Sequence, residues 1–287
     1  MRLVAYYPEG RAMRRKITMG VVIGEQVAPL TDLGSFYDSL STWKTRAAAI
    51  TKGTISLVGL DLAPPVPAGA KIICAAINYT KHGAEANLPT PDFPNLFARW
   101  TSELVTDGAA VPVPRAEPEG LDWEVELAAI VGETLTDADA AGAERAMLGY
   151  TVANDISARA SQLQSLSIST GQWCLGKNSE KSCPISSFIE TADTYKYRGR
   201  ALQTLLNGEI MQSGSTDEMV FSVGDIAAFA SRHVTLRPGD LLLTGTPDGV
   251  GYSRKPRRMM LPGDSVTVSI EGLGSITNPI VDTSARG

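Results

Sequence analysis

Two glutamates two residues apart, Glu124 and Glu126, lie in a run that is otherwise mostly apolar up to Gly132. Side chains alternate across a strand, so a strand here places both carboxylates on one face, about 6 to 7 Å apart. Two acids that close repel each other unless a cation lies between them. The spacing therefore predicts a strand that carries part of a metal site.

A solvent-exposed strand face is the simplest alternative for acids at alternate positions. The same face continues with Ala128 and Ile130, however, and the opposite face is apolar from Trp123 to Val131. A strand that is apolar on both faces lies in a core, where unpaired charge is costly. This pattern favours a buried cation site over an exposed face.

Asp155 follows Glu126 by 29 residues, at the end of a predicted strand over 150–154. It would add a third carboxylate. Three carboxylates without cysteine or histidine form an all-oxygen set of ligands, which suits Mg²⁺, with Mn²⁺ or Ca²⁺ as alternatives. A structural zinc site is disfavoured by the same reasoning.

His82 and Glu85 lie three residues apart in a polar stretch, 78–94, which we expect to be a long functional loop. If the loop closes as a helical turn, the two side chains share one face and can serve as a base and its orienting acid. An exposed histidine without a role is the alternative. The other histidine, His233, is expected to be structural.

Five motifs occur along the chain: Asn78-Tyr79-x-x-His82-x-x-Glu85, Asp122-Trp123-Glu124-Val125-Glu126-Leu127, Gly149-Tyr150-x-x-x-Asn154-Asp155-x-Ser157-Ala158-Arg159, Asn207-Gly208-Glu209 and Leu243-Thr244-Gly245-Thr246-Pro247-x-Gly249-Val250-Gly251. In this order and spacing the chain resembles the fumarylacetoacetate hydrolase family from about residue 70 to the C-terminus. Within that family it is similar to the branch of acylpyruvate hydrolases and 2-hydroxyhepta-2,4-diene-1,7-dioate isomerases.

The resemblance implies the family's mixed β-sandwich roll, a homodimer, and roles for several residues. Glu124, Glu126 and Asp155 would be the metal ligands. His82 and Glu85 would lie on a lid and activate water.

Lys177 would be catalytic, and Gln162, Thr246 and Arg99 would bind the substrate. Some residues depart from the family pattern, and these departures bear on the substrate: Arg99-Trp100 in place of Lys-Pro, Asn178-Ser179-Glu180 in place of Ser-Phe-Asp, and Ala160 in place of an acid.

The implied function is Mg²⁺-dependent hydrolysis of a carbon–carbon bond in an acylpyruvate-like 1,3-diketo acid, through a metal-stabilised enolate. Water would be activated by His82 and Glu85. Decarboxylation of an oxaloacetate-type acid, and isomerisation or hydration of an unsaturated 2-oxo acid in aromatic catabolism, are alternatives. A non-catalytic homologue is disfavoured, because a scaffold needs no clustered acids at a buried site.

Composition limits the partners. The 287 residues include 26 Lys+Arg against 31 Asp+Glu, a formal net charge of -5, which excludes the basic surface typical of nucleic-acid binding. A small anionic oxo acid is the expected partner.

Cys74, Cys174 and Cys183 are odd in number and show no Cys-x-x-Cys spacing, so they suggest neither a disulfide framework nor a thiolate zinc site, which is consistent with a reducing compartment. Five basic residues interrupt 1–24 and no apolar stretch reaches about 20 residues, so we expect a cytoplasmic protein without a membrane partner.

We expect an α+β fold, mainly β, with a small N-terminal α/β lobe and linker over 1–68 and a catalytic domain over 69–287. A proline-rich stretch, 62–69, has the composition of a linker. Expected strands and helices lie between turn signals: strands 2–7, 16–23, 71–76, 95–100, 150–154, 202–206, 241–244 and 265–270, and helices 35–51 and 138–147.

Overall fold

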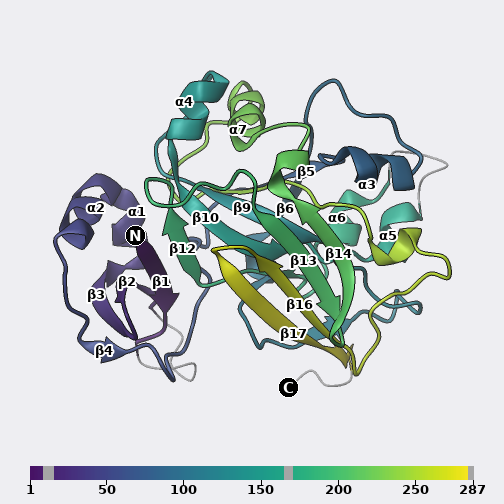
Figure 1. The fold of residues 1–287 in the computed structure, drawn as a ribbon, viewed down its shortest axis with the longest axis horizontal. Helices are drawn as coiled ribbons and strands as arrows, with labels where there is room; N and C mark the ends of the chain where they lie inside the picture. Colours follow the sequence, from purple (N-terminus) through teal and green to yellow (C-terminus); the bar gives the residue numbers. More distant parts are fainter. Residues whose placement is uncertain (9–15, 165–170, 284–287) are drawn as a thin grey trace.

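The chain folds into two β-sheets that pack against each other, with short helices around them (Figure 1). A computed structural model describes residues 1–8, 16–164 and 171–283. The expected α+β fold with mainly β content is confirmed. Three of the five basic residues near the start, Arg11, Arg14 and Arg15, lie outside the described residues.

The larger sheet has ten strands and is mostly antiparallel, with one parallel pair between β15 and β5. From one edge to the other its strands are β4 (Ile55–Ser56), β3 (Gln26–Asp32), β2 (Thr18–Ile23), β1 (Arg2–Tyr6), β12 (Phe188–Thr191), β10 (Met147–Asn154), β9 (Val125–Val131), β15 (Leu241–Leu243), β5 (Ile72–Ala76) and β6 (Asn95–Arg99). Each strand expected from the sequence in this region is present.

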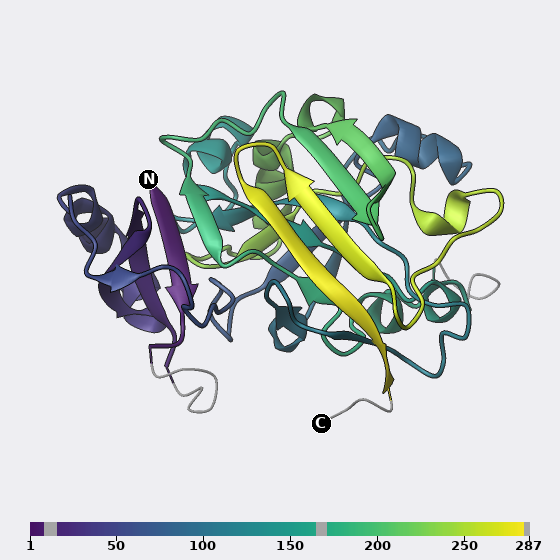
Figure 2. The same cartoon turned by 60° about the horizontal axis from the view of Figure 1, so that its bottom comes forward.

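The second sheet covers one face of β9 and β10, and its strands β16 and β17 appear in yellow in Figure 2. Its five strands are β14 (Glu209–Ser215), β13 (Ala201–Leu206), β16 (Ser265–Ile270), β17 (Gly274–Asp282) and β8 (Val111–Val113). A parallel pair, β7 (Leu104–Val105) and β11 (Cys183–Pro184), stands apart from both sheets.

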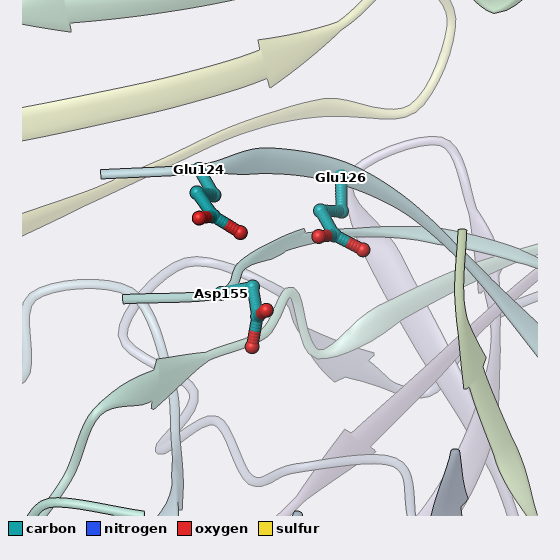
Figure 3. A group of neighbouring side chains, drawn as sticks. All are labelled: Glu124, Glu126 and Asp155. Carbon is teal, nitrogen blue, oxygen red and sulfur yellow. The ribbon is translucent and has the colours of Figure 1, made fainter. Parts of the chain in front are cut away.

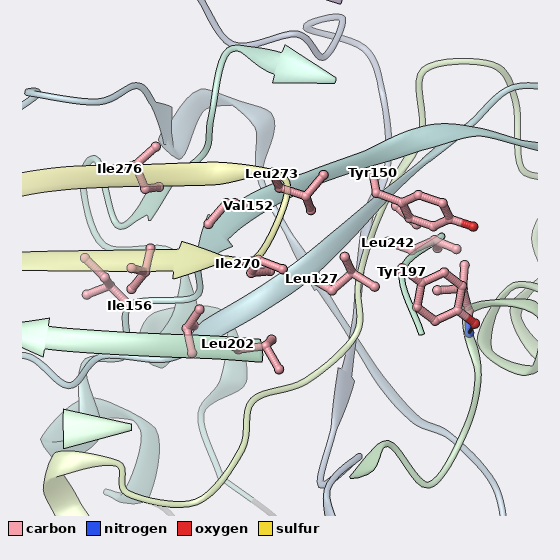
Figure 4. Close-up of a cluster of buried hydrophobic side chains, with 14 of the residues drawn as sticks. Leu127, Tyr150, Val152, Ile156, Tyr197, Leu202, Leu242, Ile270, Leu273 and Ile276 are labelled. Atoms are coloured by element: carbon pink, nitrogen blue, oxygen red, sulfur yellow. Dashed lines mark hydrogen bonds between the residues drawn. The ribbon is translucent and has the colours of Figure 1, made fainter. Parts of the chain in front are cut away.

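Strand β9 is buried on both faces, as its sequence predicts. Leu127 and its alternate neighbours face the apolar cluster between the two sheets, which Figure 4 shows with Val152 of β10 and Leu202 of β13. Ala128 and Ile130 face a second cluster on the other side of the large sheet. The strand that starts at the acids is therefore held rigidly by packing on both sides.

The helices are short: α1 (Leu33–Asp38), α2 (Leu40–Ala48), α3 (Thr80–Glu85), α4 (Ala140–Arg145), α5 (Arg159–Leu163), α6 (Trp173–Lys177) and α7 (Val223–Ser231), with 3₁₀ turns η2 (Thr101–Glu103), η3 (Thr216–Glu218) and η4 (Gly251–Ser253). None in the described ranges is long and apolar enough to cross a membrane.

One expectation about helices needs correction. The helix expected over 35–51 is two helices, since the backbone of Ser39 leaves the helical region at φ -133° and ψ 42°. Within the expected loop 78–94, the stretch that carries His82 and Glu85 forms the helical turn α3. The helix expected over 138–147 is confirmed as α4, which begins where the Asp139 carboxylate accepts the Gly142 N–H.

The N-terminal strands extend the large sheet. The strands expected over 2–7 and 16–23 are confirmed as β1 and β2, which pair as an antiparallel hairpin, and β1 also pairs with β12, with Leu3 opposite Ile189. Phe36 of α1 lies in the same apolar cluster as Ile130. The division of the chain at residue 68 stays a prediction, because one sheet and one apolar cluster run across it.

Candidate metal centre

The three acids predicted from the sequence come together (Figure 3). Glu124 directly precedes β9, Glu126 is its second residue, and Asp155 directly follows β10. The Asp155 N–H donates to the Glu124 carbonyl at 2.9 Å, which brings the two strand ends together. One carboxylate oxygen from each acid lies within 4.8 Å of the others, and all three side chains are buried.

Lysine and arginine side chains pair with two of these acids. The Lys177 Nζ lies 2.8 Å from Glu124 Oε2 and 2.5 Å from Asp155 Oδ2. Arg99 donates to Asp155 Oδ1 at 2.5 Å, and Arg159 donates to Glu124 Oε1. Both oxygens of Glu124 and both of Asp155 therefore accept from a cationic side chain.

The pKa values of the two glutamates shift in opposite directions. Burial works against ionisation of Glu124, but Lys177 and Arg159 outweigh it and hold the pKa of Glu124 well below its usual range. Burial and the charges of Asp155 and Glu124 raise the pKa of Glu126 well above its usual range. Burial likewise opposes the charge of Lys177, yet Asp155 and Glu124 raise its pKa, so its ammonium stays charged.

A divalent cation fits this set of ligands. All three are carboxylates, the preferred ligands of Mg²⁺, Mn²⁺ and Ca²⁺. Among the described residues, the one hydrogen-bond donor to Glu126 is the Gly245 N–H, at 2.7 Å. Glu126 therefore lacks the cationic partners that the other two acids have, and a bound cation would supply one.

Gly245 reaches Glu126 through a backbone that only glycine adopts without strain. Its φ is +89°, and a Cβ there would lie 2.8 Å from the Asn78 Cβ. Asn78 in turn donates to the Thr244 carbonyl and to the Phe221 carbonyl, which fixes the start of the α3 segment beside the turn.

Helix α3 carries the histidine and glutamate predicted as a pair. The His82 Nδ1 lies 2.8 Å from Glu85 Oε1, which confirms that the spacing closes as a helical turn. Glu85 Oε2 accepts the Gly249 N–H at 3.0 Å. A carboxylate on Nδ1 assigns the proton to that nitrogen and leaves Nε2 as the acceptor.

Gln162 and Thr246 lie buried close to the centre. Gln162, on α5, accepts from Arg159 at 2.9 Å. The Thr246 hydroxyl donates to the Val125 carbonyl at 2.9 Å and accepts from Gln212 at 2.9 Å. The predicted contact of either residue with a substrate stays a prediction.

Arg99 is buried beside Asp155. Its side chain is 0% exposed, and besides Asp155 it donates to the Ser182 carbonyl and hydroxyl and to the Ile156 carbonyl. Its geometry suits a residue that positions Asp155. Its predicted contact with a substrate stays a prediction.

Two residues of the centre were absent from the sequence prediction of the site. Arg159 donates through Nε to Asp122 at 2.8 Å, and Asp122 accepts the Gly251 and Tyr252 N–H groups. The turn that follows β15 is thus connected to Glu124 through these two side chains. Three buried acids require cations, and Arg159, four residues after Asp155, was the signal available in the sequence.

The sequence is similar to that of proteins of known family. The profile of the fumarylacetoacetate (FAA) hydrolase C-terminal family matches residues 71–281. The mitochondrial oxaloacetate tautomerase fahd2 of Xenopus laevis is 37% identical over 228 residues, which are 79% of this chain and 70% of that protein.

Solved structures also superpose on most of this chain. The 2-hydroxyhepta-2,4-diene-1,7-dioate isomerase from Mycobacterium marinum superposes with a TM-score of 0.75 at 28% identity, covering 99% of each chain. Fumarylpyruvate hydrolase from Pseudomonas aeruginosa, in complex with Mn²⁺ and pyruvate, gives a TM-score of 0.69 at 27% identity over 78% of this chain and 94% of that one. The branch suggested by the sequence motifs is consistent with these neighbours.

Proposed function

Because the chain belongs to the fumarylacetoacetate hydrolase family, we propose that it converts a small 2-oxo acid through the enolate of that acid. Glu124, Glu126 and Asp155 would hold a divalent cation, Mg²⁺ first, with Mn²⁺ or Ca²⁺ as alternatives. The observation that carries the proposal is this buried oxygen cluster beside a histidine paired with a carboxylate. When bound, the cation supplies Lewis-acid stabilisation of the charge on the enolate oxygen.

His82 acts as the general base in this proposal. Glu85 accepts from Nδ1, so Nε2 is free to take a proton. Because the Gly249 N–H in turn fixes Glu85, the imidazole is held in one orientation. A base positioned in this way contributes about 10² to 10⁴-fold to the rate.

Lys177 and Gln162 orient the substrate, and Thr246 contacts its carboxylate. The buried ammonium of Lys177 is kept charged by Glu124 and Asp155, so it can attract an anionic oxo acid. Arg99 acts indirectly, by holding Asp155.

Two reactions share this enolate. In the first, water deprotonated by His82 attacks the distal carbonyl of an acylpyruvate-like 1,3-diketo acid, and the carbon–carbon bond breaks with its electron pair leaving as the enolate. In the second, His82 removes a proton from the carbon next to the keto group of an oxaloacetate-type acid, and protonation of the enolate oxygen by the imidazolium or by water completes the tautomerisation to the enol. The name of the Pseudomonas aeruginosa neighbour supports the first, and that of the Xenopus laevis relative supports the second.

A substrate panel with one variant separates these reactions. Acylpyruvates, fumarylpyruvate, oxaloacetate and unsaturated 2-oxo acids would be assayed with Mg²⁺, with Mn²⁺ and with a chelator. We expect His82→Ala to lower turnover of the accepted substrate by about 10² to 10⁴-fold, with metal binding by calorimetry unchanged. His233→Ala, a change in the other histidine, should leave both unchanged.

Three results would redirect the proposal. Hydrolysis that survives His82→Ala at full rate would remove His82 as the base. Turnover that persists in the presence of chelator would remove the cation. Substrate binding without turnover across the whole panel would identify a non-catalytic member of the family.

We also propose the cytoplasm as the compartment, with a small anionic oxo acid as partner. The three cysteines are odd in number and suggest no disulfide framework, which supports a reducing compartment. The Xenopus laevis relative is named as mitochondrial, so cell fractionation would decide between the two.

A further inference from the structure

A cavity of about 700 Å³ lies between α2, the end of α4, the first half of β10 and the segment 192–198. Tyr150 lines it from β10, and Asp155 follows the end of the same strand. The two are five positions apart along an extended chain, which places them about 17 Å from each other. The cavity is therefore a separate site from the metal centre.

Three tyrosines form one wall of the cavity. The Tyr150 ring lies 6.0 Å from that of Tyr195 and 4.9 Å from that of Tyr197, measured between centroids. The Tyr195 hydroxyl donates to the Glu271 carbonyl, and the Tyr197 hydroxyl donates to Glu144. Figure 4 shows the Tyr150 and Tyr197 hydroxyls on the same side, away from the apolar core.

The Tyr150 hydroxyl is the unusual group of this wall. Its residue is 3% exposed, and its hydroxyl, which makes no hydrogen bond to a described residue, is open to the cavity and not sealed in the core. The hydroxyls of Tyr195 and Tyr197 already have partners in the fold. The Tyr150 hydroxyl is therefore available to a ligand in the cavity.

Four cationic side chains line the same cavity: Lys44, Arg145, Lys196 and Arg198. In the part of the chain that the structure describes, none of them has a carboxylate oxygen within 4.0 Å. Arg198 lies over the Tyr197 ring, and Lys196 donates to a backbone carbonyl. Their positive charge is available to an anion.

The two acids of the cavity already have partners in the fold. Glu144 accepts the Gly224 N–H at the start of α7, at 2.8 Å, besides the Tyr197 hydroxyl. A hydrogen bond from Thr191 lowers the pKa of Asp193. The cavity therefore keeps an excess of unpaired positive charge over its aromatic wall.

We propose that this cavity binds a small molecule that carries a planar aromatic ring and an anionic group. The ring packs against the tyrosine wall, the anion pairs with the arginines and lysines, and the Tyr150 hydroxyl donates to it. Arginine is well suited to phosphate and carboxylate groups. The volume is within the range of about 300 to 1,000 Å³ found for small-molecule sites.

Nucleotides and aromatic carboxylates share this chemistry, and calorimetry of the full chain distinguishes them. The probes are adenosine 5′-monophosphate and 4-hydroxybenzoate, with a chelator present so that no cation at the metal centre attracts them. Adenosine supplies a ring without charge, and ribose 5-phosphate supplies charge without an aromatic ring. We expect one of the two ring anions to bind and both partial probes to bind at least tenfold more weakly.

Two variants locate the binding. Tyr150→Phe removes only the hydroxyl and should weaken the bound probe about tenfold, the loss expected for one hydrogen bond to a charged group. Arg145→Gln, an exposed change that leaves the core untouched, should weaken it as well. Arg115→Gln, an exposed arginine outside the cavity, should not.

The inference is overturned if neither ring anion binds the unmodified chain. It is also overturned if ribose 5-phosphate or adenosine binds as tightly as the ring anions. Unchanged affinity in Arg145→Gln and in a folded Tyr150→Phe protein would place the binding elsewhere.

Discussion

The two glutamates of the metal centre share a strand but have different partners. Glu124 accepts from Lys177 and Arg159, whereas the one donor to Glu126 in the described structure is the Gly245 N–H. Removing the charge of Glu126 leaves no buried cation unpaired. Removing that of Glu124 takes one carboxylate from each of two buried cations, Lys177 and Arg159, which keep only Asp155 and Asp122 respectively, and this is costly in a buried site.

We therefore predict that Glu126→Gln abolishes cation binding and turnover while the cation-free protein keeps its stability. Glutamine has nearly the shape of the protonated acid and can still accept the Gly245 N–H. Calorimetry with Mg²⁺ and Mn²⁺ and urea unfolding of the chelated protein would measure the two effects. Metal-dependent activity retained in this variant would remove Glu126 from the ligands.

Glu124→Gln is the matched change, and it should behave differently. We expect the cation-free protein to lose more unfolding free energy than the Glu126→Gln protein does, but less than the about 3 to 5 kcal/mol of a buried charge left with no partner, because Asp155 and Asp122 still pair with Lys177 and Arg159. The same urea unfolding measures it. Equal stability of the Glu124→Gln and Glu126→Gln proteins would contradict this account of the charges.

At the scale of residues, spacing predicts the acids but not their partners. Glu124, Glu126 and the His82–Glu85 pair are close in sequence, so strand alternation and the helical turn are enough to place them. Lys177 and Arg159 reach the cluster from separate helices, and their place depends on how those helices pack.

Among the elements, the turn before β16 is held by Asp264. Both carboxylate oxygens of Asp264 accept from Arg258 Nη2. The carboxylate also accepts from the Asn207 side chain at 2.7 Å and from the Leu261 N–H. Burial works against its ionisation, but these donors outweigh it and lower the pKa of Asp264 below its ordinary 3.8. The turn is therefore stabilised by the ionised form.

A group whose pKa is lower in the folded chain stabilises the fold above its unfolded pKa. We predict that acidification from pH 5 removes this stabilisation as the pH falls through the folded pKa of Asp264. Asp264→Asn should unfold at lower urea than the unmodified chain at pH 6, and the difference should shrink towards pH 3. A difference that stays constant over this range would contradict the assignment.

Elements were predicted well where a periodic apolar pattern ends at a turn signal. The strands β13, β15 and β16 lie between such signals. The break at Ser39 between α1 and α2 has no Gly or Pro to mark it, and α3 is a single polar turn with no apolar face. In both places tertiary contacts decide the structure.

For the whole molecule, strand β6 is the end strand of the large sheet, opposite β4. Large apolar side chains beside it are exposed: Phe93 by 62%, Trp100 by 51% and Leu175 by 54%. An unpaired edge with apolar neighbours is suited to pairing with another chain. We propose that the homodimer expected from the family resemblance forms here, with a second copy of this chain.

Size-exclusion chromatography with light scattering tests this edge. We predict that the unmodified chain elutes as a dimer and that Trp100→Glu gives a folded monomer. Val58→Glu changes a residue that is 82% exposed near the opposite edge and should leave the dimer intact. A Trp100→Glu protein that remains dimeric, or a Val58→Glu protein that dissociates, would place the interface elsewhere.

The overall architecture was predictable only in part. The mainly β content follows from the many short apolar runs. The joining of residues 2–6 to the central sheet did not follow, because a hairpin followed by a proline-rich stretch reads as a separate lobe. The residue pattern within β1 or within β12 does not indicate that these two strands pair with each other.

In that pairing, β1 is synthesised long before the strand it pairs with. Leu3 pairs with Ile189, a separation of 186 residues. At about 5 to 20 residues per second, the ribosome needs about 10 to 40 s to deliver β12 after β1 has been made. Throughout that interval the outer edge of β1 lacks its partner strand. Substitutions in the first hairpin should therefore affect the yield of folded protein more than the activity of the molecules that complete folding.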